Sequence, residues 1–300
     1  MRIKSKNRKT NMIHKIKQII WISNQIISHP LIKDKKLGGL LRFCKWQLNL
    51  RFKKEIIHPY INESKLILKK GMWGGTFNCY VGLADFEEMS FLLHFLREND
   101  FFVDIGANIG TYTILASAIK KAKTLSIEPV KSTFSCLQKN IKINNIENNI
   151  KALNIGLGSK EGYCTFTTDR GPMNKVIGYC KKNKRKAIRV RKLDNLIRKN
   201  IPRIIKIDTE GFESEILKGA EKILNNNNLK AIIIELWKRE KLHKKLLSKG
   251  FYRYNYNPFS RKLIKNKSHK VNNAIYIKNL KFVKKRLVKS KKFEVLGRYI

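Results

Sequence analysis

The sequence predicts an α/β fold built on a mostly parallel sheet with helices on both faces. Short apolar runs alternate with helix-compatible runs along residues 101–248, which is the pattern of strands joined by crossover helices. The apolar run 101–105 also leads through a turn holding Gly106 and Gly110 into a helix-compatible run, and this arrangement forms a ligand crevice at the carboxyl edge of such a sheet. A chain of 300 residues is long enough to bury one large core with small additions.

The first 70 residues predict a basic extension that is partly helical. Residues 1–20 hold seven Lys or Arg and no acid, which indicates a basic arm. An amphipathic helix or two fits residues 12–32, while residues 37–70 mix apolar and polar types without a clear period. The predicted organisation is a basic N-terminal extension over 1–70, an α/β domain over 71–280 and a basic C-terminal tail over 281–300.

Residues 71–100 are expected to enter the domain through a loop, a strand and a helix. The glycine-rich segment 71–76 predicts the loop, and the apolar segment 77–81 predicts a short strand. Asp85 is the expected N-cap of a helix that continues through Leu96, because a carboxylate there accepts free backbone N–H groups and the acids after it favour a helix N-terminus.

Strand and helix signals then alternate to the end of the domain. The predicted strands are 101–105, 124–128, 150–155, 163–167, 188–191, 204–208 and 231–235, with a closing antiparallel pair at 251–256 and 273–278. The predicted helices are 109–119, 131–143, 194–199, 213–224 and 239–248. Residues 169–187 are expected to be irregular, and the tail 281–300 is expected to be weakly structured.

Two acids at neighbouring strand ends indicate a nucleotide-sized cofactor. Glu128 ends the second strand about 20 residues past the glycine turn, where a carboxylate can accept both hydroxyls of a ribose. The turn lacks the Gly-x-Gly-x-x-Gly spacing that favours a pyrophosphate. Asp104, just before the turn, would repel a phosphate but suits an ammonium or a sulfonium, so S-adenosylmethionine is favoured over a dinucleotide. The turn residues expected to bring backbone N–H groups to a ligand are Gly106, Ala107, Asn108 and Gly110.

More polar residues end the other strands at the same edge. Asn154 ends the third strand, Lys206 and Asp208 alternate onto one side of the fourth, and Glu210 lies on the turn after it. A Lys among acids beside a cofactor crevice suits removing a proton from a hydroxyl nucleophile. Glu210 and Glu213 also fit the simpler explanation of acids at a helix N-terminus, and we prefer that explanation for Glu213.

Taken in order and with their spacing, these motifs resemble the FkbM-type S-adenosylmethionine-dependent methyltransferases. The resemblance runs from about Phe77 to Lys278 and leaves the basic arm and the tail unexplained. It implies the Rossmann-like class I methyltransferase fold, with a mostly parallel seven-stranded sheet in the order 3-2-1-4-5-7-6 and an antiparallel strand 7. The segments that carry it are 102–110, 127–129, 154–158, 193–196, 206–213 and 216–219.

The resemblance also implies O-methylation of a hydroxyl on a sugar, a glycan or another small molecule. The resemblance places Asp104, Gly106 and Gly110 in the cofactor loop. It places Glu128 at the ribose and Asn154 near the adenine. The residues carried over to the substrate side are Lys206, Asp208 and Glu210. We expect Asp208 to act as the base or to orient the acceptor, with Glu210 as second choice. No cluster of His and carboxylates predicts a metal.

Two other classes stay open. An RNA methyltransferase would use the net charge of +43, because a basic surface attracts polyanions. RNA methyltransferases that act on a base amine usually have a proline-containing segment at the end of the fourth strand. Here that strand ends in Asp208-Thr209-Glu210-Gly211, which contains no proline. A non-catalytic binding module on the same fold is the third class, and the intact acids argue against it. The charge also has a compositional explanation, because Lys, Ile and Asn all have A/T-rich codons.

The remaining features predict a cytoplasmic protein. No apolar run approaches the length of a membrane span, and segment 19–27 is too interrupted for a signal-peptide core. The five cysteines are scattered, which predicts reduced thiols rather than disulfides or a metal site. The expected partner is a small-molecule or glycan acceptor, with non-specific polyanion contact through the basic segments. The sequence carries no signal for an oligomeric state.

Overall fold

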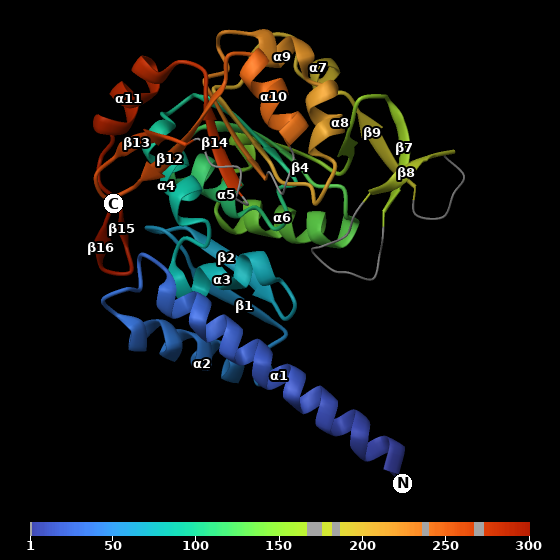
Figure 1. Ribbon diagram of the computed structural model, residues 1–300, viewed down its shortest axis with the longest axis vertical. Coiled ribbons are helices and arrows are strands. Elements are labelled where there is room, and N and C mark those ends of the chain that lie inside the picture. The colour runs from blue at the N-terminus through green and yellow to red at the C-terminus, as the bar shows by residue number, and fades with distance from the viewer. Residues whose placement is uncertain (1, 167–175, 182–186, 236–239, 267–272) are drawn as a thin grey trace.

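A computed structural model describes residues 2–166, 176–181, 187–235, 240–266 and 273–300 (Figure 1). Its centre is an eight-stranded sheet in the order β13-β12-β14-β11-β10-β3-β4-β5. The strands from β11 to β5 pair in parallel, whereas β14 is antiparallel to both β11 and β12, and β13 is antiparallel to β12. In chain order the strands are β3 (Phe101–Ile105), β4 (Lys123–Ile127), β5 (Ile150–Leu153), β10 (Ile204–Ile207), β11 (Ala231–Glu235), β12 (Tyr252–Asn257), β13 (Lys262–Lys265) and β14 (Asn273–Ile277).

The predicted fold class is confirmed, with one strand more than expected. From β5 to β12 the strands lie in the order that the resemblance implies, and β14 takes the place of the antiparallel strand 7. The extra strand, β13, extends the sheet beyond β12. Its residues are exposed or half-buried, so no alternation of buried apolar positions marks it in the sequence.

Two apolar clusters cover the two faces of the sheet. Phe102 and Ile204 belong to one cluster, while their neighbours Val103 and Ile205 belong to the other. Because consecutive strand residues point to opposite faces, each cluster lies on its own face. The first face is covered by α4 (Phe86–Phe95), α5 (Thr111–Ile114) with its π-helical continuation Leu115–Ile119, and α11 (Leu280–Val288). The second is covered by α7 (Leu193–Leu196), α8 (Glu213–Lys218), α9 (Glu221–Asn225) and α10 (Glu240–Ser248).

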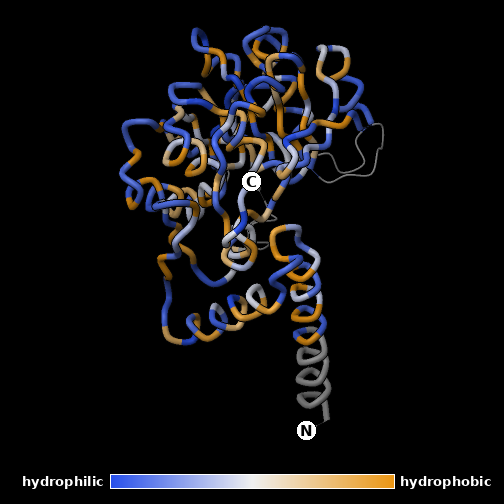
Figure 2. Tube along the Cα trace, turned by 90° about the vertical axis from the view of Figure 1, so that its left-hand side faces the viewer, coloured by the Kyte–Doolittle hydropathy of each residue, from blue (hydrophilic) through white to orange (hydrophobic). Residues whose placement is uncertain are grey.

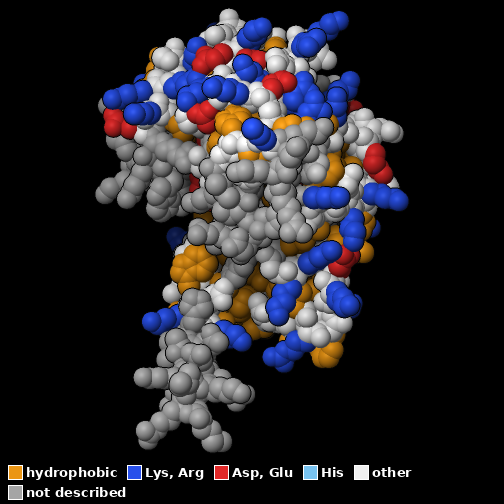
Figure 3. All heavy atoms as spheres, turned by 90° about the vertical axis from the view of Figure 1, so that its right-hand side faces the viewer, with side chains coloured by type: hydrophobic (Ala, Val, Ile, Leu, Met, Phe, Trp, Pro, Cys, Tyr) orange, Lys and Arg blue, Asp and Glu red, His pale blue; other side chains and the backbone are white. Residues whose placement is uncertain are grey.

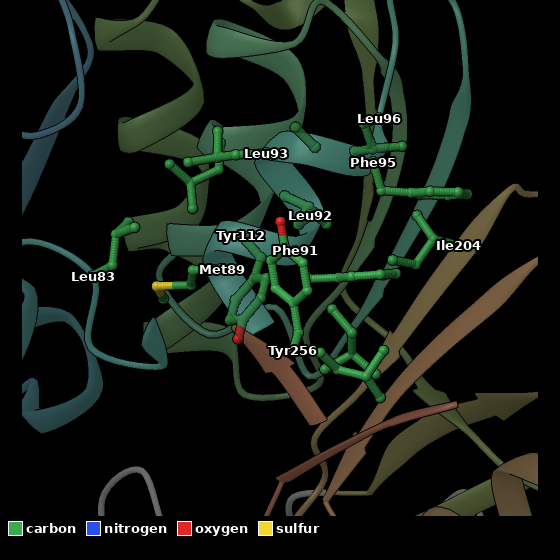
Figure 4. Close-up of a cluster of buried hydrophobic side chains, with 14 of the residues drawn as sticks. Leu83, Met89, Phe91, Leu92, Leu93, Phe95, Leu96, Tyr112, Ile204 and Tyr256 are labelled. Atoms are coloured by element: carbon green, nitrogen blue, oxygen red, sulfur yellow. The ribbon is translucent and has the colours of Figure 1, made fainter. Parts of the chain in front are cut away.

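Aromatic side chains of α4 form the centre of the first cluster (Figure 4). Phe91 stacks on Phe95 with ring centroids 5.5 Å apart and meets the Tyr256 ring at 5.6 Å. His94 is fully buried beside them, with its Nδ1 2.6 Å from the Tyr256 hydroxyl oxygen. Burial, with Arg261 nearby, lowers the pKa of His94 to about 3.

We expect His94 to make the protein less stable in acid. The unfolded imidazole takes up a proton below about pH 6.5, whereas the folded one does not until much lower pH, so stability falls by about 1.4 kcal/mol per pH unit in between. His29, whose pKa burial lowers to about 4, adds a second such effect. Urea unfolding of the wild type and His94→Gln at about pH 7 and about pH 5 measures the contribution. The variant should show the shallower pH dependence, and identical dependence in both proteins would contradict the prediction.

A smaller N-terminal part lies beneath the sheet in Figure 1. It consists of α1 (Arg2–Ser28), α2 (Lys36–Phe52), the hairpin of β1 (Glu55–Pro59) with β2 (Lys65–Lys69), and α3 (Trp73–Val81). A third apolar cluster joins Ile26 and Trp46 of this part to Ile109 and to Leu137 of α6 (Lys131–Ile143). The expected helix within 12–32 is confirmed, and the amino-terminal half of α1 extends away from the body in Figure 1. Figure 2 shows hydrophobic and hydrophilic residues interleaved along α2 and along the coloured part of α1.

The prediction of a strand at 77–81 is wrong, because this segment is the second half of α3. The helix begins inside the predicted loop 71–76. Thr76 Oγ1 and Asn78 Nδ2 donate to the carbonyl oxygens of Met72 and Gly74, four residues earlier. A short apolar run fits a buried helix as well as a strand, and here the burial of its side chains against the third cluster is compatible with the helix.

A separate four-stranded sheet, in the order β6-β9-β7-β8, lies beside the main one. Its strands are β6 (Gly156–Leu157), β7 (Gly162–Phe166), β8 (Val176–Cys180) and β9 (Ile188–Arg191). The expectation of an irregular 169–187 is therefore wrong for β8, which pairs with β7; residues 169–175 and 182–186 lie outside the described residues. The predicted helix 213–224 is two helices, since Asp194 accepts the N–H groups of Lys222 and Ile223 and so starts α9 anew.

The tail 281–300 is ordered, contrary to the prediction. It forms most of α11 and a hairpin of β15 (Glu294–Val295) with β16 (Arg298–Tyr299). Val283, Leu287 and Phe293 are at most 2% exposed and belong to the first apolar cluster. Its many Lys and Arg residues hide this apolar spacing. Arg286 also pairs with Asp100, an acid far away in the sequence that only the folded chain brings close.

Candidate functional site

The carboxyl ends of neighbouring parallel strands bring most of the predicted site residues to one edge of the sheet. Asp104 is the next-to-last residue of β3, Glu128 follows β4, and Asn154 follows β5. Lys206 lies in β10, directly opposite Asp104 in the register, and Asp208 follows that strand. The sequence prediction that these strand ends meet is therefore confirmed by the topology.

Gly106 lets the turn after β3 lie directly against the end of β10. Its φ is +72°, and a Cβ at this position would stand 1.8 Å from the carbonyl oxygen of Asp208. The N–H groups of Gly106 and Ala107 both donate to the carbonyl oxygen of Ile127. In this structure these two N–H groups therefore join the turn to β4. The predicted place of the turn residues beside a cofactor stays a prediction.

Gly110 has a comparable structural role at the start of α5. Its φ is +94°, and a Cβ there would come within 2.6 Å of the Leu137 side chain on α6. Its N–H donates to the carbonyl oxygen of Ala107 at 2.9 Å, which closes the turn. The two glycines thus allow β3, β10, α5 and α6 to converge at the crevice.

Glu128 is held at the end of β4 by two backbone N–H groups. Its Oε2 accepts from Asn108 at 3.0 Å and its Oε1 accepts from Val130 at 2.8 Å. Each carboxylate oxygen has a second lone pair, so the side chain retains the capacity to accept two hydroxyl groups. Burial raises the pKa of Glu128 to about 7, against the opposing effect of the two N–H donors.

Asn154 braces the segment that carries Glu128. Its Nδ2 donates to the carbonyl oxygens of Glu128 at 2.8 Å and of Pro129 at 3.0 Å. These bonds tie the end of β5 to the end of β4. The side chain is exposed, so its predicted place beside an adenine stays a prediction.

Asp104 is a buried acid with spare acceptor capacity. It is fully buried, and its Oδ2 accepts from the Thr113 hydroxyl at 2.7 Å. Its Oδ1 has no hydrogen-bond partner among the described residues. Burial raises the pKa of Asp104, while Lys206 and Thr113 act in the opposite direction. A buried acceptor without a partner costs free energy, which a donor on a bound ligand would relieve.

Lys206 provides the positive charge of this cluster. Its Nζ lies 3.0 Å from Oδ2 of Asp208 and 4.7 Å from the centroid of the Tyr112 ring. Burial disfavours the charged amine, but the nearby acids Asp208, Asp104 and Asp85 outweigh it and raise its pKa. The amine is therefore a permanently charged anchor for Asp208, whose own side chain is 40% exposed.

Asp85 and Tyr112 belong to the same cluster, and the sequence interpretation missed both. Asp85 stands at the N-cap position of α4, as predicted, but makes no capping bond there. Its Oδ2 accepts from the Tyr112 hydroxyl at 3.0 Å instead. Burial raises the pKa of Asp85, and the charge of Lys206 opposes that shift. The available signal was Tyr112 itself, a polar aromatic in the first turn after the glycines.

Glu210 lies on the turn after β10 and Glu213 beneath it. Glu210 has a left-handed backbone, with φ +51°. Glu213 is 1% exposed and accepts from the N–H groups of Thr209 and Gly211, so it braces the turn, in agreement with the structural explanation preferred for it. Carboxylate oxygens of Asp208, Glu210 and Glu235 lie within 4.8 Å of one another. Such a group is compatible with a divalent cation, but acidic surfaces commonly have this form without one.

A cavity of about 760 Å³ is remote from this chemistry. It opens at the opposite edge of the sheet, where Phe101, Lys123 and Ile150 begin their strands, and none of the predicted site residues lines it. Carboxyl-edge crevices are where parallel α/β sheets bind ligands. We therefore assign the functional site to the carboxyl edge.

The sheet defines a protein of the Rossmann-like α/β class, and three acids surround Lys206 at its carboxyl edge. The model of the methyltransferase FkbM domain matches residues 104–257, and the chain belongs to this family. This confirms the resemblance found in the sequence.

The curated relatives that the chain matches are methyltransferases. Methyltransferase sdnD of Sordaria araneosa is 27% identical over 195 residues, which cover 52% of this chain and 75% of that protein. Hexuronic acid methyltransferase AglP of Haloferax volcanii is 29% identical over 150 residues, which cover 48% of this chain and 59% of that protein. Among solved structures, the chain aligns with an rRNA methylase from Streptococcus thermophilus with a TM-score of 0.39 and 14% sequence identity. The aligned region covers 63% of this chain and 91% of the methylase chain.

Proposed function

We propose that this chain transfers a methyl group from S-adenosylmethionine to a hydroxyl of a sugar, a glycan or another small molecule. The observation that carries the proposal is the 3.0 Å ion pair of Lys206 with Asp208, placed beside the Gly106 turn at the carboxyl edge. The family match supports methyl transfer. The name of the AglP relative, a hexuronic acid methyltransferase, favours a sugar acceptor.

The residues present fit this cofactor. Asp104 Oδ1 is a buried acceptor without a partner among the described residues, which suits a cationic group. Glu128 keeps acceptor capacity for two ribose hydroxyls. When bound, S-adenosylmethionine supplies a methyl group on a sulfonium leaving group. We assign Asp104 and Glu128 to holding it, and Asn154 to the adenine side.

The chain's own residues then have to orient the acceptor and take its proton. Lys206 binds one oxygen of Asp208 and so fixes the direction of the carboxylate. With 40% of its side chain exposed, Asp208 is open to an acceptor hydroxyl. It can align that hydroxyl and accept its proton as the new C–O bond forms. Glu210, on the following turn, is the second candidate for the same role.

A transfer assay with methyl-labelled S-adenosylmethionine tests the proposed function. Uronic acids, nucleotide sugars and oligosaccharides form one set of acceptors, and transfer RNA and ribosomal RNA form the other. Label on a sugar hydroxyl is the expected result. Label on RNA alone would replace the proposal with the RNA methyltransferase alternative. Calorimetric binding of the cofactor with no transfer to either set would favour the non-catalytic binding module.

Glu128→Ala is expected to weaken S-adenosylmethionine binding by tenfold or more. Hydrogen bonds to a charged group contribute about 1.5–3 kcal/mol each, and about 1.4 kcal/mol is a factor of ten. Isothermal titration calorimetry measures the change. Glu147→Ala, at an exposed acid in the connection between β4 and β5, serves as the matched control and should bind as the wild type does. Unchanged affinity in Glu128→Ala would remove Glu128 from the cofactor site.

A further inference from the structure

A stripe of exposed apolar side chains runs the length of α2. Leu37, Leu41, Leu48 and Phe52 are 69%, 59%, 53% and 86% exposed. Their spacing of four, seven and four residues puts them on one side of a helix with 3.6 residues per turn. Cys44, exposed as well, fills the gap in the same line. The opposite side of α2 buries Phe43 and Trp46 in the third apolar cluster, so the stripe is additional to the side that folding requires.

The neighbouring helix α1 also exposes large apolar side chains. Ile22 and Ile26 are buried, yet Ile16, Ile20 and Trp21 are 48%, 54% and 59% exposed. Of the fifteen large hydrophobic side chains that the described part of the chain exposes, eight lie on these two helices. Scattered exposed apolar residues are ordinary on a protein surface, whereas a concentration of this kind marks an interaction surface. We call the exposed apolar residues of α1 and α2 the helical-pair surface: Ile16, Ile19, Ile20, Trp21, Leu37, Leu41, Leu48 and Phe52.

The charge around this surface has one sign. Residues 1–54 contain fifteen Lys or Arg and a single acid, Asp34, and Asp34 pairs with Arg298. Lys15, Lys17 and Lys45 are exposed beside the apolar side chains. Figure 3 shows Lys and Arg interleaved with hydrophobic side chains over the lower part of the molecule, with few acids among them.

We propose that the helical-pair surface docks this protein on an anionic lipid bilayer. Basic helices with exposed aliphatic and aromatic side chains lie in the plane of a bilayer interface, where the apolar groups enter the acyl boundary and the cations meet acidic headgroups. No helix in the part of the chain that the structure describes has the length and apolarity to cross a bilayer, so this contact is with the surface. An RNA partner would use the cations and aromatic rings, but it leaves the six exposed Ile and Leu side chains of the helical-pair surface without a role.

Vesicle flotation of the full chain tests the apolar part of the contact. We expect binding to phosphatidylcholine vesicles that contain phosphatidylserine, and little binding to phosphatidylcholine alone. Leu41→Gln/Leu48→Gln should lower the affinity by about tenfold or more, since each buried Leu contributes apolar transfer free energy. Ile264→Gln/Val288→Gln removes two apolar side chains of similar exposure, 64% and 69%, from other elements and should bind normally. An equal loss in both variants, or in neither, would overturn the proposal.

The cysteines allow a second, independent test. Cys44 lies on the stripe and is exposed, Cys180 is half-buried on β8, and the other three are buried. A polarity-sensitive dye on Cys44, in a Cys180→Ser background, should shift its emission to the blue with the anionic vesicles. The same dye on Cys180, in a Cys44→Ser background, should not shift. Three results would each overturn the proposal of bilayer docking. The dye on Cys44 could fail to shift, it could shift with RNA instead of vesicles, or it could shift with protein concentration because a second copy of the chain covers the stripe. Cofactor binding serves as a readout of folding in every variant and is independent of the outcome.

Discussion

Asp208→Asn is expected to lower the rate of methyl transfer by about 10²–10⁴-fold, the usual effect of losing a general base. The amide keeps the shape of the carboxylate but cannot take a proton, and it no longer forms the ion pair with Lys206. Single-turnover kinetics with a sugar acceptor measures the loss. Cofactor affinity should stay close to that of the wild type, because Asp208 is assigned to the acceptor and not to the cofactor.

Glu210→Gln is the matched variant for that experiment, since it removes an acid from the next turn of the same loop. We expect this variant to slow methyl transfer by less than about tenfold, because Glu210 would act only through its charge on the nearby Asp208 carboxylate. The reverse ranking of the two variants would move the proton-accepting role to Glu210. Asp208→Asn turning over at the wild-type rate would end the proposal for Asp208, and loss of its fold or of cofactor binding would show that the acid braces the crevice.

Gly106→Ala is expected to lower the free energy of unfolding by about 2–4 kcal/mol. This figure adds the cost of a left-handed backbone at a residue that has a Cβ to the cost of overpacking the core. The added carbon would stand 1.8 Å from the carbonyl oxygen of Asp208, so β3 and β10 have to separate at the crevice. Urea denaturation gives the loss of stability, and calorimetry shows whether cofactor binding falls with it.

Gly71→Ala isolates the contribution of that contact. Gly71 has a similar φ of +88°, but a Cβ there would have nothing within 4 Å. Its substitution should cost only the backbone term, about 1 kcal/mol. A loss of the same size in both variants would mean that the contact with Asp208 is not what requires glycine at position 106.

Much of the α/β part was predictable because its signals are local. The helix at Lys131–Ile143 and the strands Phe101–Ile105, Ile188–Arg191 and Ala231–Glu235 agree with the predicted boundaries. The helix buries residues at helical spacing, while Phe101–Ile105 and Ala231–Glu235 are short apolar runs that are buried almost throughout, as central parallel strands are. The division into extension, domain and tail stays a prediction, although side chains of the tail share an apolar cluster with the sheet.

The elements predicted wrongly are those whose structure depends on distant partners. The segment 77–81 is short and apolar, which fits a strand or a helix, and in the folded chain it is a helix packed in the third apolar cluster. α11 alternates apolar residues with four cations and buries two of the apolar ones, Val283 and Leu287. The acid that pairs with its Arg286 is Asp100, nearly two hundred positions away. Such pairings have no trace in local periodicity.

By itself, the sequence determined which residues end the parallel strands, because strand ends and side-chain alternation follow from short-range patterns. The order of the strands came from the family resemblance. Only the tertiary structure decided what the side chains at those strand ends do. In the folded chain the Gly106 and Ala107 N–H groups donate to the end of β4. Asp85 accepts from the Tyr112 hydroxyl instead of capping a helix, and Lys206 is buried among three acids. Those contacts depend on how β3, β10, α4 and α5 approach one another in space, and the free energy of burying a charge is defined only once all of its neighbours are in place.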